Sequence, residues 1–148
     1  MSKPITKIEL NGFRGATTAF ELELDPLKNI TMLFGENGTG KSSILDAIDV
    51  VCNGTVGCLG DISVGQGAGM YLCAIGSAPA ALRATIHSGA DKWIGTLRKN
   101  AIDVIGPANK PYVKILRRSE ILELILAQPN ERYKALKHFI DIGIVEHP

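Results

Sequence analysis

Residues 35–42 read GENGTGKS and combine three glycines with a lysine and a serine. This is the complete G-x-x-x-x-G-K-S pattern, in which backbone N–H groups surround the phosphates of a nucleotide. Gly35, Gly38 and Gly40 let the backbone curl with its N–H groups pointing inward, because side chains there would obstruct the concave surface. We expect a helix to begin near Lys41, which adds free N–H groups and a positive dipole end. The pattern therefore predicts a phosphate-binding loop.

The side chains of this loop have separate expected roles. Lys41 can reach the β- and γ-phosphates and is the candidate catalytic residue, and the Ser42 hydroxyl is the expected Mg²⁺ ligand. Asn37 and Ser43 can add hydrogen bonds at the rim of the site. The residues of the loop predicted to bind nucleotide are Gly35, Asn37, Gly38, Thr39, Gly40, Lys41, Ser42 and Ser43.

The segments on either side of the loop match the elements that such a loop requires. Residues 30–34 (ITMLF) are almost wholly apolar, which predicts a strand buried on both faces. After the loop, Ile44 and Ile48 recur at helical spacing, and Asp46 and Asp49 are expected to point away from the core. A strand, a glycine loop and a helix in this order distinguish a true P-loop from a chance match.

The rest of the chain predicts short strands followed by helices. Alternating residues predict half-exposed strands at 7–10 and 20–24, which we expect to pair in an antiparallel manner. Residues 53–69 are rich in glycine and predict irregular structure. The further predicted elements are strands at 81–88, 92–99, 101–105 and 112–116, then helices at 120–127 and 130–140, separated by a break at Gln128 and Pro129.

Composition sets broad limits on the kind of protein. The 148 residues are 45% apolar and 21% charged, which is typical of a soluble domain with a real core. The net charge of +1 argues neither for nor against nucleic acid as a partner. No uncharged run is long enough to cross a membrane, and the first ten residues do not form a signal peptide. Cys52, Cys58 and Cys73 form no C-x-x-C pair, so we expect buried or neutral thiols in a reducing cytoplasm.

Hydrolysis requires more than a phosphate-binding loop. A second acid that acts near the metal normally follows an apolar strand, and no run of apolar residues here ends in Asp-Glu. Residues 103–106 match D-x-x-G, but Tyr112 stands where a guanine-binding Asp would be required. Residues 63–67 resemble the serine-glycine motif of ABC-type ATPases but follow the P-loop too closely. The chain is therefore expected to lack a complete hydrolytic site.

The N-terminal part resembles the SMC, RecF and SbcC group of ABC-type ATPases. The resemblance depends on Gly12-Phe13-Arg14-Gly15 after an alternating strand, on Phe20, and on the run FGENGTGKSSILDAI. Residues 116–136 also resemble the segment of SbcC-type proteins that leads into a coiled coil. The resemblance implies an α/β P-loop NTPase fold. Residues 1–148 would then form an ABC-ATPase-like N-terminal lobe, with an antiparallel β-subdomain beside the P-loop strand and helix.

This resemblance implies a split enzyme that uses ATP and Mg²⁺. The Walker B acid and the remaining catalytic motifs would lie in a C-terminal lobe of the same protein, and two heads would enclose two ATP molecules. Arg14 would lie near the nucleotide. The implied partners are the C-terminal lobe, a second head, DNA and a nuclease. Residues 1–148 alone are expected to bind ATP with negligible turnover.

One position departs from the family pattern. Arg118 aligns with a glutamine that touches Mg²⁺ in the family, and arginine cannot ligate a cation. Either Gln128 or Glu120 substitutes, the alignment is shifted, or coupling between the lobes differs in this protein.

The sequence favours an ATPase head that acts in DNA repair, recombination or defence against foreign DNA, and it leaves alternatives open. The first is the ATPase head of an OLD-type nuclease, whose loops more often read N-N-S-G-K-S. The second is the nucleotide-binding domain of an ABC transporter, which the Gly12-Phe13-Arg14 run disfavours. A small-molecule kinase normally starts at the P-loop strand, so the 34 residues before Gly35 argue against that class.

Overall fold

The computed structural model describes residues 4–55, 71–98, 101–126 and 128. The chain divides into two compact units, Met1–Val113 and Lys114–Pro148. The first unit contains the sheet and the phosphate-binding loop, and the second contains helix α3 (Arg118–Leu126). No helix in the described ranges is long and apolar enough to cross a membrane.

The first unit is built on an antiparallel sheet of five strands in the order β2-β1-β3-β4-β5. The strands are β1 (Lys7–Asn11), β2 (Phe20–Glu23), β3 (Arg83–Ser88), β4 (Asp91–Arg98) and β5 (Ala101–Ile105). The predicted antiparallel pairing of the first two strands is confirmed, with Ile8 opposite Leu22. Three of the four strands predicted after residue 80 are also confirmed: the bounds of β5 match, and those of β3 and β4 differ by one or two residues.

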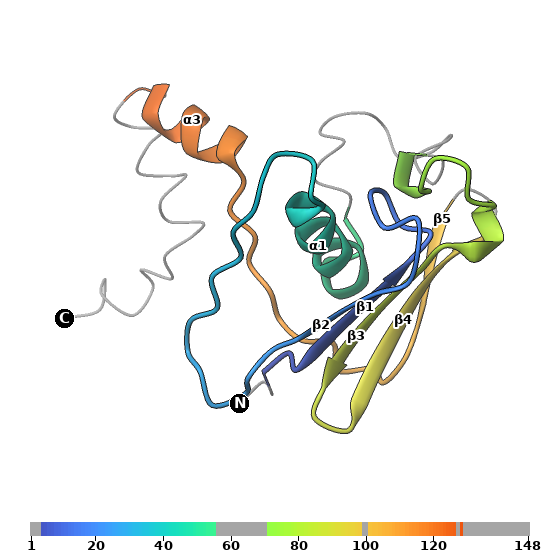
Figure 1. Ribbon diagram of the computed structural model, residues 1–148. Coiled ribbons are helices and arrows are strands. Elements are labelled where there is room, and N and C mark those ends of the chain that lie inside the picture. Colours follow the sequence, from blue (N-terminus) through green and yellow to red (C-terminus); the bar gives the residue numbers. More distant parts are fainter. Residues whose placement is uncertain (1–3, 56–70, 99–100, 127, 129–148) are drawn as a thin grey trace. The chain divides into compact units, whose positions relative to one another are not determined.

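One face of the sheet is covered by helix α1 (Lys41–Ile48), which continues as a short π-helical segment, η1 (Asp49–Asn53) (Figure 1). Strand alternation directs Ile8, Ile86 and Trp93, which are paired across neighbouring strands, into this buried layer. A Cβ added at Gly95 would lie 3.2 Å from Val51 Cγ2, so a glycine in β4 allows η1 to approach the sheet closely.

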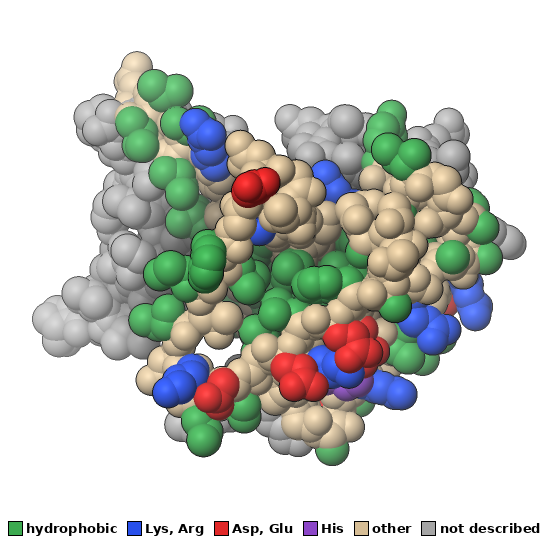
Figure 2. All heavy atoms as spheres, viewed as in Figure 1, with side chains coloured by type: hydrophobic (Ala, Val, Ile, Leu, Met, Phe, Trp, Pro, Cys, Tyr) green, Lys and Arg blue, Asp and Glu red, His purple; other side chains and the backbone are tan. Residues whose placement is uncertain are grey.

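The opposite face of the sheet is polar. The Lys7 ammonium lies 2.8 Å from a Glu9 oxygen and 2.9 Å from a Glu21 oxygen, and His87 Nε2 lies 3.4 Å from Glu9. Acidic and basic side chains gather there around the purple histidine (Figure 2). The hydrogen bond from Lys7 holds the pKa of Glu9 below its usual value. Exposed pairs of this kind stabilise a fold only slightly, so the core lies on the α1 side.

The predicted strand before the phosphate-binding loop is not formed. Residues 27–34 contain no helix or strand, and the side chains of Ile30, Met32 and Phe34 are 83%, 80% and 91% exposed. A strand requires a neighbour that satisfies its backbone N–H and C=O groups, and none of the described residues pairs with this segment. The strand predicted at 112–116 is likewise absent.

The prediction that Asp46 and Asp49 point away from the core is wrong, whereas Ile44 is buried as expected. Asp46 and Asp49 are buried, whereas Leu45 is 43% exposed. The acids tolerate burial because polar groups meet them: Asp49 accepts hydrogen bonds from Asn53 Nδ2 (3.1 Å) and Thr55 Oγ1 (2.5 Å). Apolar periodicity misassigned the two acids, because it counts an acid as a surface residue.

The second unit confirms one predicted helix. Helix α3 begins two residues before the expected start at 120, and Ile121, Leu122, Ile125 and Leu126 are exposed. The helix predicted at 130–140 lies outside the described residues, as does most of the glycine-rich segment 53–69.

The approach of the chain to Trp93 generates a stability prediction. Trp93 Nε1 donates a hydrogen bond to the Pro107 carbonyl (2.8 Å), and a Cβ at Gly106 would lie 2.5 Å from Trp93 Cδ1 and 2.7 Å from the Lys92 carbonyl. Gly106→Ala should therefore lower the free energy of unfolding by about 1–3 kcal/mol in a urea titration. Gly15→Ala is the matched control, because a Cβ there would make only ordinary contacts at 3.5 and 3.8 Å. Equal losses in the two variants would contradict this packing.

Candidate nucleotide-binding site

Two glycines of the phosphate-binding loop have a backbone conformation that favours glycine. Gly38 and Gly40 have φ values of 89° and 90°, in the left-handed region that residues with side chains rarely adopt. Gly40 is the N-cap of α1, and its carbonyl accepts the Ile44 N–H at 3.2 Å. The helix therefore begins directly after the loop, and its free N–H groups are available to an anion.

The Lys41 side chain folds back over the loop. Its ammonium group donates hydrogen bonds to the carbonyl oxygens of Gly35 (2.8 Å) and Glu36 (2.5 Å). The Thr39 hydroxyl donates to the same Glu36 carbonyl at 2.9 Å. The positive charge thus lies above the loop. A charged phosphate oxygen accepts a stronger hydrogen bond from this ammonium group than a carbonyl oxygen does. This position is compatible with the predicted contact of Lys41 with phosphate.

The other loop residues divide between solvent and core. Asn37 and Ser42 are exposed, so their side chains are accessible to a nucleotide and a metal ion. Ser43 is buried, and its hydroxyl oxygen accepts the Gly15 N–H at 3.4 Å. Ser43 therefore connects the loop to the segment between β1 and β2, which the sequence had not indicated.

The connection between β1 and β2 lies against the phosphate-binding loop. A Cβ added at Gly15 would lie 3.8 Å from Gly40 Cα. The preceding residues are held by a segment distant in sequence: Arg14 N–H donates to the Leu72 carbonyl, and Ala74 N–H donates to the Gly12 carbonyl, both at 2.8 Å. The family resemblance predicts that Arg14 lies near the nucleotide, and in the structure the next residue, Gly15, lies against the loop.

The Arg14 side chain forms an ion pair with Asp46 on the second turn of α1. Asp46 is only 1% exposed, whereas the Arg14 side chain is 32% exposed. The sequence identified Arg14 as a site residue through its family resemblance but assigned Asp46 to the surface. An acid one turn beyond a P-loop carries no local sign of its partner, because the two residues are far apart in the chain.

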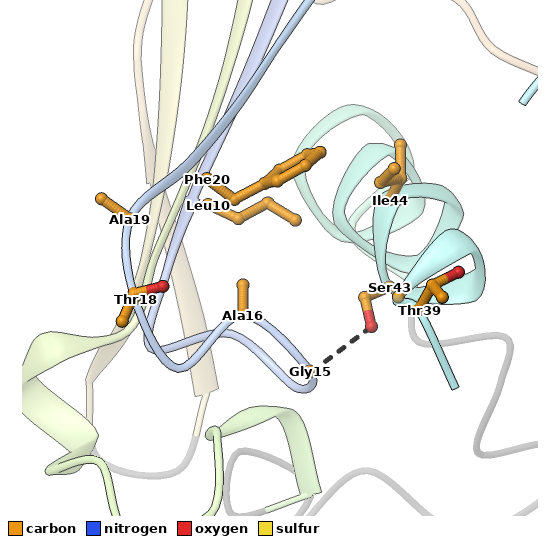
Figure 3. Close-up of a pocket in the computed structure, with 10 residues that line it drawn as sticks. Leu10, Gly15, Ala16, Thr18, Ala19, Phe20, Thr39, Ser43 and Ile44 are labelled. Carbon is orange, nitrogen blue, oxygen red and sulfur yellow. Dashed lines mark hydrogen bonds between the residues drawn. The ribbon is translucent and has the colours of Figure 1, made fainter. Parts of the chain in front are cut away.

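A cavity of about 170 Å³ adjoins the loop (Figure 3). Leu10, Phe20 and Ile44 supply apolar surface, and the Ser43 hydroxyl lies at its rim beside Gly15. Phe20 was expected to begin a strand and to match the family pattern, but not to line a cavity. The small residues between Gly15 and Phe20 were the available signal, since they leave space beside the helix.

The structure also describes the surroundings of other residues considered in the sequence. Asp103 is on edge strand β5, where its carboxylate is 3.6 Å from Arg98 Nε. Arg118 begins α3 in the second unit, Gln128 is exposed, and Cys58 is outside the described residues. Burial raises the pKa of the Cys52 thiol to about 11, so this thiol stays protonated at neutral pH. The described ranges contain no group of three or more His, Cys, Asp or Glu that could hold a metal.

A glycine loop that caps a helix, with a lysine ammonium group folded back onto it, is typical of a P-loop nucleotide-binding domain. A family model described as an AAA domain matches residues 7–139, so the chain belongs to this family of P-loop ATPases. Its members bind ATP, usually with Mg²⁺, which agrees with the predicted cofactors. No curated protein matched the chain.

The left-handed glycine at the helix start generates a second prediction. A Cβ at Gly40 would have no atom within 4 Å, so only the φ of 90° opposes a side chain there. Gly40→Ala should therefore lower the free energy of unfolding by about 1–2 kcal/mol, measured in urea. Gly15→Ala is the matched control, because its Cβ would make ordinary contacts at 3.5 and 3.8 Å. If both variants unfolded at the same urea concentration, backbone strain would not explain the glycine.

Proposed function

We propose that this chain is the ATP- and Mg²⁺-binding N-terminal lobe of a split ATPase head of the SMC/RecF/SbcC type. In the complete protein it would act on DNA in repair, recombination or defence against foreign DNA, in the cytoplasm. The observation that carries this proposal is the exposed apolar segment that leads into the phosphate-binding loop.

That segment has the composition of a central strand but not the surroundings of one. Residues 30–34 are almost wholly apolar, yet Ile30, Met32 and Phe34 are nearly fully exposed. Hydrophobic side chains project along this part of the surface (Figure 2). Strands buried on both faces belong to parallel sheets, and a continuous exposed apolar surface marks an interaction site. A C-terminal lobe that supplies neighbouring strands would cover these side chains and satisfy the backbone.

The distribution of catalytic groups supports the same division. Lys41 and Ser42 would meet phosphate and metal, whereas Asp103 on β5 pairs with Arg98 of the neighbouring strand β4. Hydrolysis requires a water-orienting or metal-associated acid in addition to the loop. We propose that this acid lies in the C-terminal lobe and that a second head supplies a further catalytic motif.

The assignment to DNA transactions rests on the GFRG run before the loop and on the family match. AAA domains of this family occur in proteins of the SMC/RecF/SbcC group, and the backbone of the GFRG run lies against the loop. A nuclease partner is part of this proposal on the family resemblance alone.

Nucleotide binding is tested first. The 148-residue chain should bind ATP·Mg²⁺, and Lys41→Ala should weaken binding about tenfold or more in calorimetry, because the variant lacks the charge over the loop. Lys92→Ala is the control, since Lys92 is an exposed lysine on the polar face of the sheet. Phosphate release should not exceed that of Lys41→Ala. Sustained hydrolysis that depends on Lys41 would refute the half-site, and equal affinity in all three proteins would refute the nucleotide site.

The missing neighbour of residues 30–34 is tested by hydrogen exchange. In the 148-residue chain, the amides of 31–34 should exchange almost as fast as those of an unfolded peptide, because no described residue pairs with them as a strand. Amides of the central strand β3 are the internal control and should be strongly protected. In a chain that includes the C-terminal lobe, the amides of 31–34 should become protected. Protection of these amides in the 148-residue chain would contradict the proposal.

A further inference from the structure

We propose that Asp46 is a positioning residue for the nucleotide site and acts through Arg14. Its carboxylate would fix the Arg14 guanidinium beside the phosphate-binding loop, so that the remaining N–H donors of Arg14 face the nucleotide phosphates. This inference rests on the proposed nucleotide-binding function, and it assigns a role to a residue that the P-loop motif does not include.

The first observation is the burial of Asp46 on the helix that follows the loop. Its side chain is 1% exposed, within the layer that α1 presents to the sheet beside Ala47 and Val50. A carboxylate in such a position destabilises a protein unless a charge or hydrogen bonds compensate it. Arg14 Nη1 provides both. An apolar residue would fill this position at lower cost, so the acid is better explained by what it holds.

The second observation is the state of Arg14. Its side chain is 32% exposed and that of Asp46 is 1% exposed, so a ligand can reach the arginine of this pair but not the aspartate. The guanidinium has five N–H donors in a fixed fork, and Nη1 makes the bond to Asp46. The donors that point away from Asp46 can meet a phosphate, which guanidinium groups bind in a directed manner.

The third observation is the backbone around Arg14. Arg14 has φ +47°, the only positive value among the described residues other than glycine. Such a conformation is unfavourable for a residue with a side chain and persists where neighbouring contacts maintain it. Here the N–H bond to Leu72 holds the backbone and Asp46 holds the side chain.

Two contacts fix the position of this connection along the helix. Gly15 N–H meets Ser43, and the Arg14 guanidinium meets Asp46. Residues three apart lie on the same face of a helix, so both contacts attach the β1–β2 connection to one side of the first two turns of α1. That helix start is also the end that would bind phosphate, and a Cβ at Gly15 would lie 3.8 Å from Gly40 Cα. Loss of the Asp46 contact would release the guanidinium.

A double-mutant cycle on ATP·Mg²⁺ affinity tests the proposal. Asp46→Asn should weaken binding about fivefold when Arg14 is present and less than about twofold in an Arg14→Gln background, because its effect passes through Arg14. Arg14→Lys should restore part of the affinity lost in Arg14→Gln only when Asp46 is present. A merely structural role would instead weaken binding equally in both backgrounds, which would overturn the proposal. If Asp46→Asn unfolds the chain, Asp46→Ser replaces it in the same cycle.

A second measurement requires no nucleotide. Trypsin cleaves after arginine, and the engaged Arg14 side chain should protect the Arg14–Gly15 bond. Asp46→Asn should accelerate cleavage there about fivefold while cleavage after the exposed Lys28 stays unchanged. Unchanged cleavage after Arg14 would show that Asp46 does not hold it. Failure of Lys41→Ala to alter ATP affinity would refute the proposed function, whereas failure of the cycle with a normal Lys41 effect would refute only the role of Asp46.

Discussion

The attachment of the β1–β2 connection to helix α1 is the contact on which the site depends. It joins two parts of the chain that the sequence separates by about thirty residues, through the Arg14–Asp46 ion pair and the Gly15–Ser43 hydrogen bond. The sheet supplies the other half of this arrangement, because α1 packs its apolar side onto Ile8 and Ile86. The phosphate-binding loop thus lies beside the β1–β2 connection and α1. The relative position of these two elements is fixed by burial and by one buried charge.

Two properties of the site have different origins: the conformation of the loop, and the strands that would surround it in a complete ATPase. The loop conformation is set locally by glycines at φ near +90° and by the helix that follows, so it needs no other domain. The strand that should precede it requires hydrogen-bonding neighbours, and residues 30–34 have none among the described residues. The conformation of the loop is therefore a local property of this chain, whereas a strand at residues 30–34 would depend on additional strands.

The degree to which each element was predictable follows from how local its cause is. The five strands were predictable because polar and apolar residues alternate on a sheet with one covered face, as in Lys7–Asn11 and Phe20–Glu23. A strand was predicted at 30–34 but is not formed, because an apolar run of this kind is typical of a strand that other strands surround. The burial of Asp46 and Asp49 was also missed, since hydrophobic periodicity counts an acid as a surface residue even where a partner elsewhere in the chain compensates it.

The sequence by itself determined the phosphate-binding loop, its glycine conformations and the antiparallel pairing of the first strands, because each depends on residues close together in the chain. It also indicated the family, which the match over residues 7–139 supports in its coarser form as an AAA domain. Only the tertiary structure decided that Asp46 is buried and that a cavity opens beside Phe20. It also decided that Ser43 accepts a hydrogen bond from Gly15 and that Asp46 accepts one from Arg14. These features depend on hydrogen bonds and packing between segments distant in sequence, and no local pattern encodes a partner that the fold alone brings near.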